Sequence, residues 1–190
     1  WISNPQSRKN SHHIRSTVKG ILVGRNTAEQ DNPSLTVRLT NNELGLGKGE
    51  IIQQPVKIIL GNLKRSKKVS NIFTGNSEVI VGSSQSAKKS KNVEYLKYKK
   101  KNFLEEFLQD LLDRNISSIL VGGGQKTLNA FLVNNLFDEL VLYTAPMFLG
   151  KESKDAISVK APDKIKASLK LQMKGVEKFK DDIKTTYYNK

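Results

Sequence analysis

The fold is decided by the stretch Gly24-Arg25-Asn26-Thr27-Ala28-Glu29-Gln30-Asp31-Asn32-Pro33-Ser34-Leu35-Thr36-Val37-Arg38. It follows the apolar run Ile21-Leu22-Val23, which predicts a buried strand. A strand that stops at a glycine and opens into a polar loop is where α/β proteins place ligands. This loop supplies a hydroxyl, a carboxylate, an amide and a guanidinium. That mixture favours a phosphorylated sugar over an apolar ligand.

Strand-like and helix-like patterns alternate over the first two thirds of the chain, which predicts an α/β fold. The expected strands are 18–24, 56–60, 78–82, 93–98, 117–121 and 137–148, and the expected helices are 4–17, 26–30, 103–112 and one after 124. We expect a mostly parallel central sheet with flanking helices. Alternating residues over 165–174 and 183–188 predict a C-terminal antiparallel hairpin at the edge of that sheet.

The composition argues against several classes of function. The net charge is +14, but only six of the 32 basic residues are arginine and only 7% of residues are aromatic, which disfavours nucleic-acid binding. Without cysteine, and with only His12 and His13 as histidines, the chain predicts no metal site. No apolar run is long enough to predict a membrane span. A solvated, lysine-rich surface is the simplest explanation of the charge.

Two further features are compatible with an anion, and each also has a purely structural explanation. Gly122-Gly123-Gly124 lies between a predicted strand and a predicted helix, so it predicts either a phosphate site at the helix start or a tight turn. Arg15 lies at the end of the first predicted helix, where a cation offsets the helix dipole. Arg15 and Arg38 together would suit a phosphate, because guanidinium groups match its oxygens.

Motifs along nearly the whole chain also follow one family pattern in order and spacing. They are Trp1-Ile2-Ser3, Arg15, Gly20-Ile21-Leu22-Val23-Gly24, Thr27, Asp31-Asn32-Pro33-Ser34-Leu35-Thr36-Val37-Arg38, Pro55-Val56-Lys57-Ile58-Ile59-Leu60, the glycine run, Asp138-Glu139-Leu140-Val141-Leu142-Tyr143-Thr144-Ala145-Pro146 and Leu149-Gly150. Together they resemble the reductase domain of the bifunctional riboflavin-biosynthesis deaminase/reductase. This resemblance implies a dihydrofolate-reductase-like fold.

The resemblance also implies an activity: the NADPH-dependent reduction of the ribosyl group of 5-amino-6-(5-phosphoribosylamino)uracil to a ribityl chain. It implies a cytoplasmic homodimer that acts on a phosphorylated ribosylaminopyrimidine. Carried over by position, the cofactor site would comprise Trp1, Ser3, Thr27, Asp31, Asn62, Gly124, Gln125, Lys126, Thr127, Leu128, Asn129 and Ala130. Arg15, Leu35 and Arg38 would hold the substrate, with the arginines near its phosphate. Asp31 is the candidate catalytic residue, and no other is assigned.

The chain departs from the family pattern at identifiable positions. Gly122 stands where the family has a glutamate that contacts substrate, and Gly61 stands where the family has an aspartate. The family's first strand, with its lysine-bearing loop, would precede Trp1. We therefore expect residues 1–190 to be a single reductase domain without that strand, and without the zinc-dependent deaminase domain. The alternatives are a related reductase of another pteridine or pyrimidine, an inactive fragment, or a basic module that binds nucleic acid.

Overall fold

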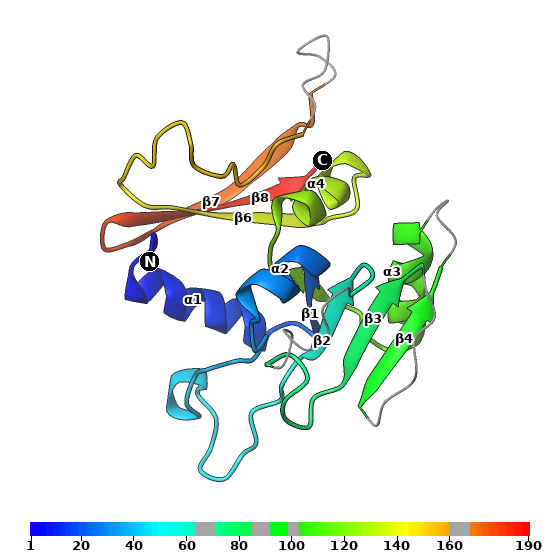
Figure 1. Ribbon diagram of the computed structural model, residues 1–190. Helices are drawn as coiled ribbons and strands as arrows, with labels where there is room; N and C mark the ends of the chain where they lie inside the picture. The colour runs from blue at the N-terminus through cyan, green and yellow to red at the C-terminus, as the bar shows by residue number, and fades with distance from the viewer. Residues whose placement is uncertain (64–70, 85–91, 99–102, 160–167) are drawn as a thin grey trace. The chain divides into compact units, whose positions relative to one another are not determined.

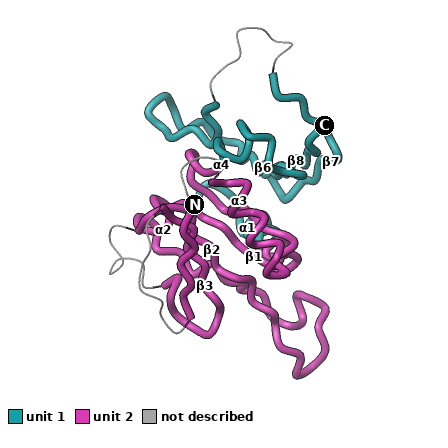
Figure 2. Tube along the Cα trace, turned by 90° about the vertical axis from the view of Figure 1, so that its right-hand side faces the viewer, with its two compact units in different colours: residues 1–11, 128–190 teal, residues 12–127 magenta. Residues whose placement is uncertain are grey.

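The computed structural model describes residues 1–63, 71–84, 92–98, 103–159 and 168–190 (Figure 1). The chain folds into two compact units (Figure 2). One unit is residues 12–127, and the other is residues 1–11 with 128–190. The boundaries fall within helices α1 (Pro5–Ser16) and α4 (Gln125–Val133).

The unit of residues 12–127 contains a five-stranded parallel sheet of order β4-β3-β2-β1-β5. Its strands are β1 (Gly20–Gly24), β2 (Val56–Leu60), β3 (Val79–Ser83), β4 (Val93–Lys97) and β5 (Ile119–Val121). Strands β2, β3 and β4 are added in turn on one side of β1, and β5 then pairs with β1 on its other side. The strand order therefore reverses between β1 and β5. In open α/β sheets, the carboxyl ends of the strands at such a point form the usual ligand site.

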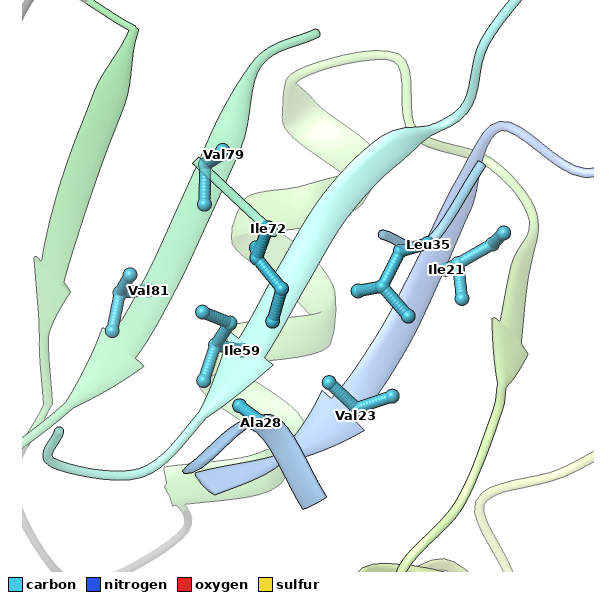
Figure 3. Close-up of a cluster of buried hydrophobic side chains, with 8 residues drawn as sticks. All are labelled: Ile21, Val23, Ala28, Leu35, Ile59, Ile72, Val79 and Val81. Atoms are coloured by element: carbon cyan, nitrogen blue, oxygen red, sulfur yellow. The ribbon is translucent and has the colours of Figure 1, made fainter. Parts of the chain in front are cut away.

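The hydrophobic core of this unit lies against one face of β1, β2 and β3 (Figure 3). Strands in a parallel sheet are covered on both faces, which explains why β1 and β3 are largely apolar. The cluster consists of Ile21, Val23, Ala28, Leu35, Ile59, Ile72, Val79 and Val81. Leu35 joins this core with a left-handed backbone, φ 52°. Leucine rarely adopts that conformation, so the residue is anchored by its buried side chain.

A lysine also lies inside this unit. Lys57 of β2 is 1% exposed, and its Nζ donates to the carbonyls of Ile72 and Thr74 at 2.9 and 2.8 Å. Burial lowers the pKa of this amine. The two hydrogen bonds satisfy a group that would otherwise be costly to bury, and they tie the segment after residue 70 to the sheet.

The helices of this unit begin and end where the local sequence demands. Helix α2 (Arg25–Asp31) follows β1 directly and ends at Asn32, whose φ is 43°. Asparagine tolerates that left-handed cap, and the proline after it disfavours further helix. Helix α3 (Phe103–Asp113) buries Phe107 and Leu111, as its amphipathic pattern predicts. A short 3₁₀ helix, η1 (Asn42–Leu44), interrupts the long loop before β2.

The unit of residues 1–11 and 128–190 contains a three-stranded antiparallel sheet of order β6-β8-β7. Its strands are β6 (Glu139–Thr144), β7 (Leu171–Phe179) and β8 (Asp182–Asn189). The predicted hairpin is thus confirmed, but two details were wrong. Its first strand is 171–179 rather than 165–174, of which 165–167 lie outside the described residues. The hairpin pairs with β6 in a second sheet rather than forming the edge of the parallel sheet.

Other predicted segments also changed. The apolar run 137–148 forms a strand only over 139–144, because Pro146 cannot continue the hydrogen-bond ladder. Strands β1 and β5 each begin two residues later than the predicted segments 18–24 and 117–121.

Asp182 fixes the start of α1 within its own unit. Its Oδ2 accepts hydrogen bonds from the Asn4 main-chain N–H at 2.8 Å and from the Ser7 hydroxyl at 2.6 Å. The pKa of this carboxyl is lowered most by the hydrogen bond from the Ser7 hydroxyl, and next by the one from the Asn4 N–H. A depressed carboxyl pKa stabilises the fold above the unfolded-state value, and this stability is lost as the pH falls through the folded-state pKa.

We therefore expect Asp182→Asn to lower Tm by several degrees at pH 7, because the charge-assisted hydrogen bonds are weakened. The gap to the unmodified protein should close as the pH falls below the ordinary aspartate pKa and through the lowered pKa of Asp182, where this carboxyl itself becomes protonated. Thermal unfolding monitored by circular dichroism at a series of pH values measures this. Asp181→Asn, at the exposed neighbouring carboxylate, is the control. A constant gap at every pH would contradict the role of the charge.

Candidate functional site

The carboxyl ends of β1 and β5 approach each other closely through two glycines and two threonines. A Cβ on Gly24 would lie 2.1 Å from the Thr127 Oγ1, and a Cβ on Gly124 would lie 2.7 Å from the Thr27 Oγ1. The last residue of β1 therefore lies against the first turn of α4, and the loop before α4 lies against Thr27 of α2. This interlocked arrangement brings together Thr27, Gly124 and Thr127 of the predicted cofactor site.

The turn into α4 exposes backbone rather than side chains. Gly123 and Gly124 have φ of 143° and 85°, conformations that favour glycine. The Thr127 N–H donates to the Gly124 carbonyl at 2.8 Å, while Gln125 and Lys126 provide side-chain donors in the same turn. An oxyanion suits such a helix start, because main-chain N–H groups there lack helical partners.

A second polar group lies at the ends of β2 and β3. The Asn62 side chain accepts from the Ser84 N–H and donates to the Ser84 hydroxyl, both at 3.0 Å. The Arg25 guanidinium, at the start of α2, donates to the Asn62 carbonyl at 3.4 Å and to the Asn26 side chain at 3.3 Å. Asn62 is thus held by hydrogen bonds at the same edge of the sheet as Thr27. Its role in binding the cofactor stays a prediction. Arg25 was not among the predicted site residues.

Arg15, Arg38 and His12 form a cluster of basic side chains. Burial lowers the pKa of Arg15 most, and the nearby charge of Arg38 lowers it further. Burial, followed by the charges of Arg15 and Arg38, lowers the pKa of His12. Within the described ranges, no carboxylate forms an ion pair with either arginine. Two adjacent guanidinium groups that lack a carboxylate repel each other, so an anion between them would relieve that repulsion.

The same cluster shows how the polar loop is held. Arg38 donates from its Nη2 to the Ser34 hydroxyl at 3.3 Å, and Arg15 donates from its Nη1 to the Thr36 carbonyl at 3.4 Å. Arg15 therefore contacts the loop rather than only the end of its own helix. Leu35 lies beneath this loop as a core side chain. The structure thus brings Arg15 and Arg38 together, whereas Leu35 is a core side chain. That the three residues hold the substrate stays a prediction.

Asp31 lies apart from these contacts as an exposed residue at the end of α2. Its candidacy as a catalytic residue stays a prediction. The sequence pointed to no contact between His12 and Arg38. In the structure, the Arg38 main-chain N–H donates to the His12 Nδ1 at 3.2 Å. No local sequence signal joins residues that lie 26 positions apart.

The remaining predicted cofactor residues belong to the other unit. Trp1 is 98% exposed, with the Arg8 guanidinium 4.8 Å from its ring centroid, and the Ser3 carbonyl accepts from Arg8. Asn129 of α4 exchanges two hydrogen bonds with the Ser158 main chain, at 2.8 and 3.0 Å. Leu128 and Ala130 flank Asn129 on α4 and are half-buried.

The two departures from the family pattern differ in their geometry. Gly122 is exposed, and a Cβ there would make ordinary contacts, the nearest being 3.5 Å from the Ile21 Cγ2. Gly61 has a φ of 115°, a backbone conformation that is strained for any residue with a side chain. A glutamate would therefore fit at position 122, whereas an aspartate at position 61 would require the backbone to change.

Within the described part of the chain, no three acidic or histidine side chains gather where they could hold a metal ion. Among the same residues, no helix is both long and apolar enough to cross a bilayer.

Comparison with known proteins decides the family. The model of the RibD C-terminal domain matches residues 1–185. The chain belongs to the RibD C-terminal domain family. The riboflavin biosynthesis protein RibD of Aquifex aeolicus is 33% identical over 190 residues, which cover 96% of this chain and 50% of that protein. The chain therefore spans about half the length of this RibD relative.

A shorter relative matches over nearly its whole length. The 5-amino-6-(5-phosphoribosylamino)uracil reductase of Buchnera aphidicola is 29% identical over 193 residues, which cover 97% of this chain and 93% of that protein. Among solved structures, RibD of Acinetobacter baumannii superposes with a TM-score of 0.85 at 22% identity, covering all of this chain and 52% of that one. This likeness confirms the α/β fold of the RibD reductase domain.

Proposed function

We propose that this RibD-family chain reduces the ribosyl group of 5-amino-6-(5-phosphoribosylamino)uracil to the ribityl chain with NADPH. The observation that carries the proposal is the pair of guanidinium groups, Arg15 and Arg38, which lack a carboxylate partner among the described residues. A substrate phosphate would supply the anionic partner for both groups. The similarity to the Buchnera reductase supplies the reaction.

The chain offers groups suited to a dinucleotide at the switch point between β1 and β5. When bound, NADPH supplies a hydride. Thr27, Thr127 and the main-chain N–H groups after Gly124 would hold its polar atoms, and Asn62 would extend that surface along the sheet edge. We assign no proton donor, because Asp31 makes no contact that defines such a role. The contribution of this chain is then to hold cofactor and substrate together, which can account for much of the rate of such a reaction.

The test is NADPH oxidation with the phosphorylated substrate, with the product identified by mass spectrometry as the substrate plus two hydrogen atoms. The same substrate without its phosphate, and NADH in place of NADPH, complete the comparison. We expect turnover with the phosphorylated substrate, weaker binding of the unphosphorylated one and a preference for NADPH. Turnover only with another pteridine or pyrimidine would reassign the substrate. We also propose that the chain forms a homodimer, as its family resemblance implies, and sedimentation of the active protein tests this.

Gly122→Glu is expected to raise kcat/KM for this reaction, by about tenfold if the side chain adds one hydrogen bond to substrate. The position has room and an ordinary backbone, so Tm should change little. Steady-state kinetics and thermal unfolding check the two parts. Gly122→Gln, which fills the same space without the charge, is the matched control. Equal rates for Gly122→Glu and the unmodified protein would show that the absent carboxylate does not limit this chain.

A further inference from the structure

The segment Thr36–Arg38 is held in place by side chains instead of a strand partner. It belongs to neither of the described sheets. On one side, the Gln54 side chain accepts from the Val37 N–H at 2.9 Å and donates to the Val37 carbonyl at 3.4 Å. On the other side, α1 meets Thr36 and Arg38. The main chain of Arg38 is thus set by a few identifiable hydrogen bonds.

His12 contacts the main chain of Arg38 itself. Its Nδ1 accepts from the Arg38 main-chain N–H at 3.2 Å. Acceptance requires a lone pair on Nδ1, which only the neutral ring with its proton on Nε2 provides. Burial and the charges of Arg15 and Arg38 lower the pKa of His12, although a hydrogen bond with the Thr36 backbone opposes this effect. The lowered pKa favours the neutral ring that this hydrogen bond requires.

The Arg38 guanidinium has little else to fix its position. The side chain is exposed, and its described hydrogen bond is a 3.3 Å contact to the Ser34 hydroxyl. A long side chain of this kind keeps considerable rotational freedom. Fixing its main chain beside α1 limits where the guanidinium can reach, and keeps it near Arg15.

We propose that His12 is a positioning residue of the phosphate site: its Nδ1 holds the main chain of Arg38 and thereby keeps the two guanidinium groups close enough to bind one phosphate together. This proposal rests on the proposed function in taking the anion to be the substrate phosphate. It adds that an imidazole acts through Arg38 without touching the substrate.

The first test measures the affinity of inorganic phosphate by calorimetry, with no turnover involved. His12→Leu removes the acceptor and should weaken binding about tenfold, the equivalent of one hydrogen bond. His12→Asn offers its Oδ1 as an acceptor near the position of Nδ1 and should recover most of the affinity. His13→Ala, at the adjacent histidine, should bind phosphate as the unmodified protein does. Circular dichroism checks that each variant is folded.

Kinetics separate positioning from a general structural defect. His12→Leu should raise KM for the phosphorylated substrate and leave kcat unchanged, because the reacting atoms are untouched. Equal loss in His12→Asn and His12→Leu would overturn the acceptor role, as would unchanged phosphate affinity in His12→Leu. An unmodified protein that binds no phosphate would also overturn the proposal. Phosphate affinity that follows this pattern in a chain with no reductase activity would reject the proposed reaction and leave His12 in its role.

Nuclear magnetic resonance gives a direct measurement of the ring. Nitrogen-15 shifts of His12 at neutral pH should show an unprotonated Nδ1 and a protonated Nε2. A proton on Nδ1 would overturn the proposal, since that nitrogen could not then accept from Arg38.

Discussion

Arg15→Met is expected to lower kcat/KM for the phosphorylated substrate by about 100-fold. Charge-assisted hydrogen bonds contribute about 1.5–3 kcal/mol each, so losing a two-pronged contact with a phosphate readily accounts for that factor. The loss should appear mainly in KM, because the phosphate lies away from the reacting carbon. The kcat/KM of Arg15→Lys should lie between those of Arg15→Met and the unmodified protein, since an ammonium group keeps the charge but lacks the planar guanidinium geometry.

Steady-state kinetics with phosphorylated and unphosphorylated substrates measure this effect. The unphosphorylated substrate should react equally with Arg15→Met and the unmodified protein. Arg114→Met is a matched control, because Arg114 is engaged with Glu94 at 3.0 and 3.1 Å rather than with the phosphate cluster. The phosphate assignment would be wrong if Arg15→Met lost the same factor on both substrates.

Gly24→Ala is expected to destabilise the protein by about 2 kcal/mol, a typical cost of forcing extra atoms into a packed site. Its Cβ would lie 2.1 Å from the Thr127 Oγ1, well inside contact distance. The strain falls where β1 and the first turn of α4 meet, so cofactor affinity should decrease as well. Denaturant unfolding gives the stability, and fluorescence titration with NADPH gives the affinity.

The structure also identifies the variant that should relieve this strain. The Thr127 Oγ1 is the close atom, whereas the Thr127 Cβ is 3.4 Å away. Combining Gly24→Ala with Thr127→Ala should therefore cost less stability than the sum of the two single changes, which a double-mutant cycle measures. Gly175→Ala is the control, since a Cβ there meets no atom within 4 Å. Additive costs would show that the two positions do not press on each other.

Local patterns in the sequence were sufficient where one segment determines its own structure. The buried run before Gly24, the Asn32-Pro33 stop and the amphipathic face of α3 predicted β1, α2 and α3. The hairpin was harder to place, because apolar and polar residues alternate over much of the C-terminal region and a period of two does not fix where a strand begins. The hairpin pairs with β6, a segment that lies far from it in the sequence, and no local pattern predicts that partner.

The candidate site shows the same division. Recognisable motifs contain the glycines, Thr27, Arg15 and Arg38, so these residues could be predicted from the sequence. The contact between His12 and Arg38 depends on how α1 lies against a loop that has no strand partner, and no spacing rule describes it. Nor could the sequence show that Gly61 has a positive φ whereas Gly122 has room for a side chain.

The position of β1 has a consequence for how the chain acquires its structure. Gly20 pairs on one side with Val56 and on the other with Ile119. While a ribosome is still making the residues before β5, the first strand has an unsatisfied edge that another chain could occupy. Pairings between such distant residues form slowly, so folding of this sheet should finish late in synthesis and depend on protection of that edge until Ile119 emerges.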